Sequence, residues 1–148
     1  MKRIIVVVFL LAAAGVLAAC SSAETDTVSM TEFTLTATDI AYDVNRLEAV
    51  AGQPVRITMR NEGALEHDFS IMEMPHMGEV MAEEAEGGMA GHDMGDMDME
   101  PEVHIAPPMG ESLNVEFTPS TPGEYEFFCT VAGHKEAGMV GTLIVTAP

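Results

Sequence analysis

The sequence predicts an all-β fold, a Greek-key antiparallel β-sandwich. Apolar residues occupy every second position in several short segments, which is the pattern of strands with one buried face. Turn-forming residues separate these segments at short intervals, and no segment has a convincing amphipathic-helix pattern. Many short strands without helices favour two packed sheets with Greek-key connections.

The first expected strands occupy residues 33–37 and 55–60, where apolar side chains alternate with threonines and arginines. Turn signals at residues 51–54 and 61–63 bound the second of these strands. Residues 113–117 alternate in the same way. Each segment therefore predicts a strand with one face toward the core.

Three residues with metal-binding side chains lie where such core-facing rows end. His67 lies two residues before Phe69 and shares its face of the expected strand. Cys129 lies two residues after Phe127 and shares its face in the same way. Met139 begins the row of the last expected strand. Because alternate residues of a strand share a face, these side chains are expected to meet at one pole of the sandwich.

The spacing around Cys129 strengthens this expectation. Four residues separate Cys129 from His134, and four more separate His134 from Met139, while His67 lies upstream. Two imidazoles, one thiolate and one thioether form the ligand set of a blue-copper electron-transfer site. The thiolate and thioether suit Cu(I) and the imidazoles suit Cu(II), so the set serves both oxidation states.

In these residues the chain resembles the cupredoxins, above all their azurin-, auracyanin- and rusticyanin-like members. The resemblance covers residues 30–148 except for an unusual stretch at 73–109. It implies one type 1 copper held by the four residues above, with His134 as the electron port. It also implies a contact near the metal between Asp68 and Thr130. Azurin-like relatives usually carry Asn where this chain has Asp68, so the acceptor is kept and the amide donor is lost.

The N-terminal residues predict an exported lipoprotein. A basic start, an apolar run and small residues make residues 1–19 resemble a bacterial lipoprotein signal peptide. Cys20 would then be the lipidated residue and residues 20–29 a tether to a bacterial membrane, on its periplasmic or outer face. The alternative is an ordinary secretory signal with an incidental Cys20. With only two cysteines in the chain, lipidation would leave Cys129 without a disulfide partner in an oxidising compartment.

The charge of the chain limits its partners. After removal of residues 1–19, four basic residues remain against 24 carboxylates. Nucleic acid and anionic membrane surfaces are therefore unfavourable partners. We expect a monomer that meets basic redox proteins, such as cytochromes or membrane electron-transfer complexes.

Residues 73–109 depart from the pattern of the rest of the chain. They are rich in Met, His and carboxylates and contain no Lys or Arg, which predicts a mobile insertion with a short helix around Glu79 to Glu86. Thioethers and imidazoles could bind additional Cu(I) or Cu(II); the alternative is an acidic loop whose apolar residues touch the domain or a partner. The candidate ligands are Met74, His76, Met77, His92, Met94, Met97, Met99 and His104.

Two functions follow from these features. The complete ligand set favours a membrane-anchored electron carrier, because copper bound to a thiolate is poorly suited to release. The Met/His-rich insertion favours copper handling as a chaperone, buffer or resistance factor. An enzyme is not expected, because copper oxidases and nitrite reductases need further histidines, and three of the five histidines lie in the insertion.

Overall fold

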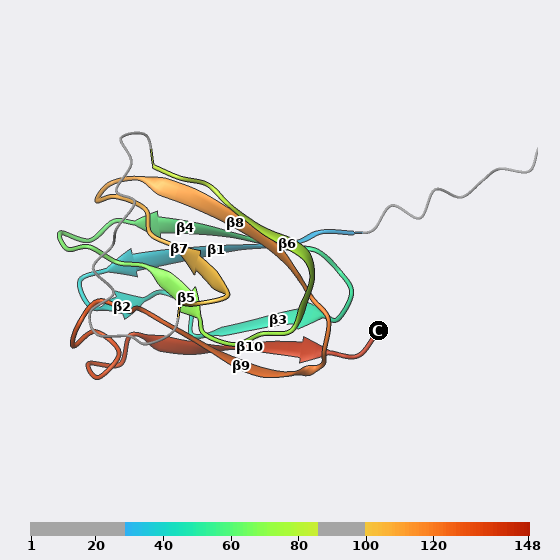
Figure 1. Cartoon of the computed structure of the whole chain (residues 1–148). Helices are drawn as coiled ribbons and strands as arrows, with labels where there is room; N and C mark the ends of the chain where they lie inside the picture. The colour runs from blue at the N-terminus through green and yellow to red at the C-terminus, as the bar shows by residue number, and fades with distance from the viewer. Residues whose placement is uncertain (1–28, 86–99) are drawn as a thin grey trace, which may run out of the picture.

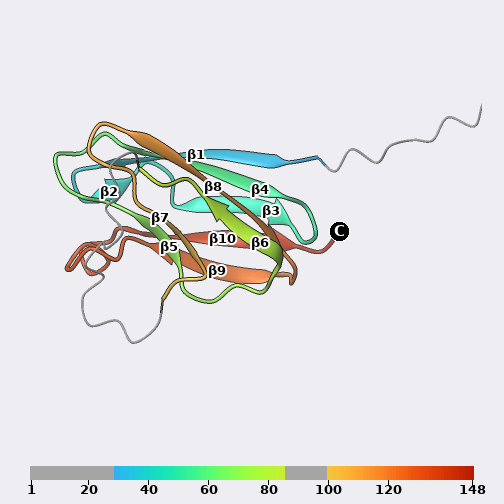
Figure 2. The same ribbon diagram turned by 45° about the horizontal axis from the view of Figure 1, so that its top comes forward.

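Residues 29–85 and 100–148 are described in the computed structural model, and every regular element among them is a β-strand. The predictions made for residues 1–28, including the signal peptide and Cys20, lie outside the described residues. None of the described residues belongs to a helix that could cross a bilayer. The strands form two sheets that pack face to face (Figures 1 and 2), as the all-β prediction requires.

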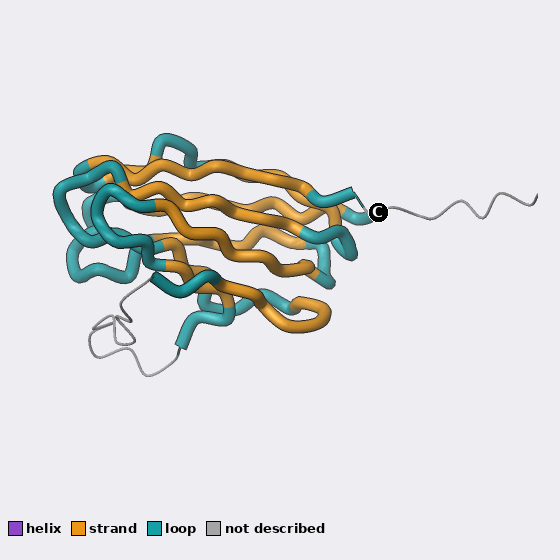
Figure 3. The backbone as a smooth tube through the Cα atoms, turned by 90° about the horizontal axis from the view of Figure 1, so that it is seen from above, coloured by secondary structure: helices purple, strands orange, loops and turns teal. Residues whose placement is uncertain are grey.

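Each sheet contains five strands. The first, in spatial order, is β2 (Ala41–Tyr42), β1 (Thr31–Thr38), β4 (Val55–Asn61), β8 (Ser112–Pro119) and β6 (His76–Ala82). The second is β3 (Arg46–Val50), β10 (Val140–Thr146), β9 (Gly123–Phe128), β5 (Phe69–Ile71) and β7 (Val103–Ile105). Figure 3 shows that the connections gather at the two ends of the strands.

The core lies between the two sheets and is built from the predicted alternation. Leu35 and Ile57 from the first sheet and Leu143 from the second are fully buried. Phe69 and Phe127 are also fully buried, with ring centroids 5.1 Å apart. Burying a side chain of this size stabilises the fold by about 1.5–3 kcal/mol. The core thus fixes the strands whose ends carry the candidate ligands.

The prediction of an antiparallel sandwich needs one correction. Most pairings are antiparallel, but β1 pairs with β4 in parallel, and so does β3 with β10. The reason is topological: the chain leaves the first sheet after β2, forms β3 in the second sheet, and returns as β4. Parallel neighbours require such a crossover connection, whereas alternation along one strand carries no information on the direction of its partner.

The prediction for residues 73–109 was wrong at both ends of the segment. In place of a helix near residue 79, β6 pairs antiparallel with β8, with an irregularity between Met77 and Met81. After residues 86–99, which are outside the described residues, β7 pairs with β5. Most residues of β6 are exposed because it lies at the edge of its sheet. An edge strand exposed on both faces shows no alternation, so the sequence pattern did not indicate it.

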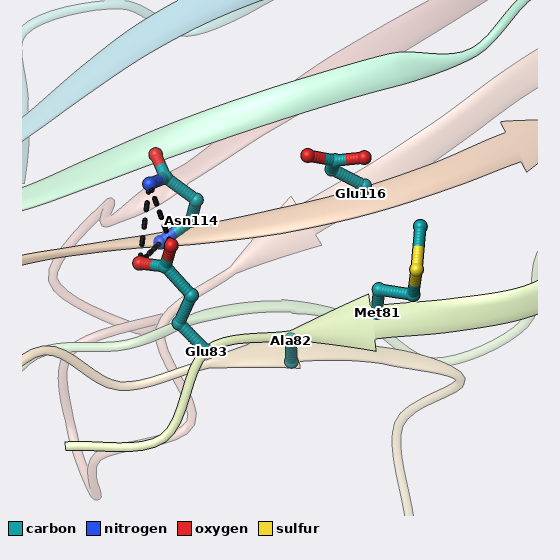
Figure 4. A pocket seen from close by; sticks show the side chains of 5 residues that line it. All are labelled: Met81, Ala82, Glu83, Asn114 and Glu116. Atoms are coloured by element: carbon teal, nitrogen blue, oxygen red, sulfur yellow. Dashed lines mark hydrogen bonds between the residues drawn. The ribbon is translucent and has the colours of Figure 1, made fainter.

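A side-chain clamp holds the end of β6 against β8. The carboxylate of Glu83 accepts hydrogen bonds from the backbone N–H and the amide group of Asn114, at 3.0 and 3.1 Å (Figure 4). These residues, with Met81, Ala82 and Glu116, line a shallow groove of about 150 Å³ between the two strands. The groove is therefore part of the edge of the first sheet.

Candidate metal centre

Three of the predicted ligands meet at one end of the sandwich. One donor atom each from His67, Cys129 and His134 lies within 4.8 Å of the others, and all three residues are buried. Cys129 Sγ lies 3.4 Å from Nδ1 of His134, and the two imidazole centroids are 5.0 Å apart. Figure 1 shows the β4–β5 and β9–β10 connections that carry them at the same end of the molecule.

Met139 lies at the base of the same connection. Its side chain is fully buried, and its backbone N–H donates to the carbonyl of His134 at 2.9 Å. The N–H of Cys129 in turn donates to the carbonyl of Met139 at 3.1 Å. These two hydrogen bonds hold Met139 next to two of the other candidate ligands, so the β9–β10 connection supplies three of the four.

Two glycines shape this connection. Gly133 has φ of 83° and Gly138 has φ of 103°, values that side chains other than that of glycine rarely adopt. The carbonyl of Gly133 accepts from the N–H of Ala137, and the N–H of Gly138 donates to the carbonyl of Lys135, each at 3.0 Å. The turns place His134 between the glycines, where its side chain reaches the cluster.

Asp68 ties the β4–β5 connection to the residue that follows the cysteine. It is completely buried, and its Oδ1 accepts the backbone N–H of Thr130 at 2.7 Å. Its Oδ2 accepts the hydroxyl of the same threonine. Both donors come from Thr130, so a carboxylate satisfies this contact without the amide donor that Asn would offer. The predicted contact between Asp68 and Thr130 is thus present.

Burial also determines the protonation of the cluster. It raises the pKa of the Cys129 thiol to about 11, with a further contribution from the nearby Asp68 carboxylate. It lowers the pKa of His67, and the neighbouring His134 adds to this effect. At neutral pH the metal-free site therefore holds a thiol and a neutral His67. A metal that binds there displaces the thiol proton.

The donor set fits copper on two further grounds. Both ring nitrogens of His67 are buried without a hydrogen-bond partner that meets ordinary distance and angle criteria. A buried polar atom without a partner is costly, and coordination of a metal by one of these nitrogens would remove part of that cost. A soft thiolate with imidazoles and a thioether is also the combination that copper prefers.

The structure separates the candidate auxiliary ligands. Met74 is fully buried in the core, whereas 49% of Met77 is exposed. The half-buried His76 has its Nδ1 3.1 Å from the carbonyl oxygen of Met74. His104 lies on β7 beside Asp68, with Nε2 3.6 Å from Oδ2. The remaining candidates, His92, Met94, Met97 and Met99, lie outside the described residues.

Sequence reasoning missed two contacts around Asp68. Tyr42 donates its hydroxyl hydrogen bond to the Asp68 backbone carbonyl at 2.5 Å, and His104 faces the Asp68 carboxylate. Both residues lie on strands of two or three residues. Such short segments carry too little periodicity to be recognised, and no local signal links them to position 68.

A two-sheet sandwich with buried His, Cys and Met at one pole defines a copper-binding protein of the cupredoxin class. The sequence profile of the plastocyanin/azurin family of copper-binding proteins matches residues 28–146, and the chain belongs to this family. Copper is accordingly the cofactor of the His67, Cys129 and His134 site.

Two relatives have names that refer to copper resistance. The copper-resistant cuproprotein CopI of Pseudomonas aeruginosa is 32% identical over 131 aligned residues, which cover 72% of this chain and 71% of that protein. A CopI of Rubrivivax gelatinosus is 28% identical over 104 residues, or 70% of this chain and 59% of that protein.

Solved structures of auracyanins share the fold. Auracyanin A of Chloroflexus aurantiacus superimposes with a TM-score of 0.59 at 21% identity, over 80% of this chain and all of that chain. The reduced auracyanin of Roseiflexus castenholzii gives a TM-score of 0.58 at 23% identity, over 78% of this chain and 97% of that one. At this level of identity the comparison supports the fold of the chain and no particular function.

Proposed function

We propose that the protein is a non-enzymatic electron carrier that cycles one type 1 copper between Cu(II) and Cu(I). The observation that carries this proposal is the buried cluster of His67, Cys129 and His134. Bound copper would supply the one-electron chemistry, with Met139 as a weak axial ligand. The chain holds its donors on the ends of packed strands and on a hydrogen-bonded connection, so that little rearrangement accompanies the electron.

Electrons would enter and leave through His134. It is 6% exposed, whereas His67, Cys129 and Met139 have no exposed surface. The connections after β1, β4 and β7 lie at the same end of the sandwich (Figure 1), and they carry the exposed apolar residues Ile40, Leu65 and Met109. An apolar rim of this kind suits a brief encounter with a redox protein better than a permanent interface.

Membrane attachment is part of the same proposal. Lipid on Cys20 would anchor the monomer outside the cytoplasm, and residues up to 29 would let the sandwich reach a cytochrome or a membrane electron-transfer complex. The acidic composition, a net charge of −18 over the whole chain, would favour a basic partner.

The visible spectrum of the copper-loaded protein tests the carrier. We expect the domain from residue 29 onward, loaded with one equivalent of Cu(II), to show an intense charge-transfer band from the Cys129 thiolate that disappears on addition of ascorbate. Paramagnetic resonance should show one copper signal that vanishes with the band. A pale protein with several weakly bound coppers would contradict the proposal.

Copper handling is the second candidate, and the two CopI relatives favour it because both are named copper-resistant. Under this proposal residues 86–99 capture further copper, since they contain His92, Met94, Met97 and Met99. We expect replacement of residues 86–99 by a Gly-Ser linker of equal length to reduce the number of bound Cu(I) ions while the type 1 site stays loaded. This replacement leaves β6 and β7 unchanged. Equal copper stoichiometry in the two proteins would rule out capture by this segment.

A further inference from the structure

The strand that returns from the insertion brings a histidine to the metal end of the sandwich. β7 pairs antiparallel with β5, and His104 stands opposite Ser70 in this pairing. Asp68 precedes β5 by one residue, so the side chain of His104 can reach back to it. Nε2 of His104 lies 3.6 Å from Oδ2 of Asp68, with the imidazole side chain 28% exposed and the carboxylate fully buried.

The same carboxylate also holds the copper-binding connection. Asp68 accepts both hydrogen bonds of Thr130, the residue after Cys129. Burial alone would raise the pKa of this carboxyl, but His104 and the two Thr130 donors hold the pKa below its ordinary value. A buried carboxylate needs such partners, because removing one of them leaves its charge poorly compensated. His104 faces Oδ2, the same oxygen that accepts the Thr130 hydroxyl.

We propose that His104 is a positioning residue that orients the Asp68 carboxylate toward Thr130 and so sets the geometry and reduction potential at Cys129. The part of this proposal that concerns the potential rests on the electron-carrier function proposed above. Through β7, which carries His104, the insertion is thereby connected to the metal centre. Its histidine acts within the protein scaffold, in contrast to the auxiliary copper ligand that composition suggests.

Amide hydrogen exchange in the metal-free protein tests the first half of the proposal. The side chain of His104→Leu has no donor, so the Asp68 carboxylate would no longer be held toward the Thr130 N–H. We expect the Thr130 amide to exchange at least about tenfold faster than in the parent, as for the loss of its hydrogen bond to a charged acceptor. His104→Gln keeps an N–H donor and should recover most of the protection. Thr58→Val is the control, because it removes a half-buried side-chain hydrogen bond in the opposite sheet, 2.6 Å long to Asn114. It should leave Thr130 exchange unchanged.

The reduction potential of the copper-loaded proteins tests the second half. A carboxylate with less compensation adds negative charge beside the thiolate and favours Cu(II), so His104→Leu should have a lower potential than the parent. His104→Gln should return toward the parent value, and Thr58→Val should equal it. Unchanged exchange and potential in His104→Leu would overturn the proposal, as would the loss of one copper equivalent with an unchanged potential. If the parent lacks a blue copper band, the carrier function fails, while the exchange result still decides whether His104 positions the contact between Asp68 and Thr130.

Discussion

At the scale of single residues, Asp68 shows how a substitution can keep a contact by different chemistry. An Asn at this position offers one acceptor and one donor, whereas Asp offers two acceptors. The chain supplies two donors from Thr130, so the carboxylate is satisfied on the side of the copper-binding connection. Nε2 of His104 faces the same carboxylate, 3.6 Å from Oδ2. The identity of residue 68 is thus matched by two residues distant in the sequence.

We expect Asp68→Asn to change the acid stability of the metal-free protein. The folded pKa of Asp68 is lowered, so its contribution to the free energy of unfolding is complete above the unfolded pKa of about 3.9 and is lost as pH falls through the folded value. Asn does not titrate, and this part of the pH dependence should be missing. Denaturant unfolding between pH 7 and pH 2 measures it, and parallel stability curves for the two proteins would contradict the expectation.

At the scale of elements, the pairing of β9 with β10 positions most of the site. Cys129 follows β9 and Met139 precedes β10, so their separation depends on the register of this pair. The register places Gly141 opposite Phe127. A Cβ at position 141 would lie 2.2 Å from the Phe127 ring and 2.7 Å from the carbonyl oxygen of Asn45. The absence of a side chain at Gly141 therefore allows this packing.

Gly141→Ala should destabilise the domain and disturb the metal site. Overpacking of this kind lowers the free energy of unfolding by about 1–3 kcal/mol, and movement of β10 would displace Met139. Gly123→Ala is the matched control, because the atoms nearest to its added Cβ would belong to the Tyr125 side chain, at 3.3 Å. We expect the control to lose less than about 1 kcal/mol. Denaturant unfolding measures both losses, and equal stability of the two variants would refute the steric argument.

At the scale of the whole molecule, charge determines the choice of partner. The chain carries 24 carboxylates against six lysines and arginines, and the arginines on the sheets already pair with carboxylates, as Arg56 does with Glu32 and Glu116. Such exposed pairs add little stability. The surplus of negative charge instead produces a field that attracts cationic partners and repels anionic ones.

The salt dependence of electron transfer should follow from this field. The second-order rate of oxidation of the reduced protein by a cationic cobalt(III) phenanthroline complex should fall as ionic strength rises. With anionic ferricyanide the rate should rise, because salt screens repulsion instead of attraction. Stopped-flow measurements between about 10 mM and 500 mM salt compare the rates with the two oxidants. Over this range the screening length falls from about 30 Å to a few Å. The same salt dependence for both oxidants would contradict steering by the net charge.

The sequence by itself determined the local features of this protein. Alternation in strands such as 55–60 indicated which faces are buried, and the spacing from Cys129 to Met139 indicated the donor set. Both are local, because the pleat of a strand and the length of a connection depend on neighbouring residues. The meeting of His67 with that connection was also predictable, since each residue lies where a core-facing row ends.

Only the tertiary structure decided the partners of these local features. It placed β1 parallel to β4, formed β6 at an exposed edge, and brought His104 to Asp68. Pairing direction, edge strands and contacts across 36 residues of sequence depend on where distant segments pack. A strand that is exposed on both faces, or that has only three residues, shows no apolar periodicity in the sequence from which its packing could be predicted.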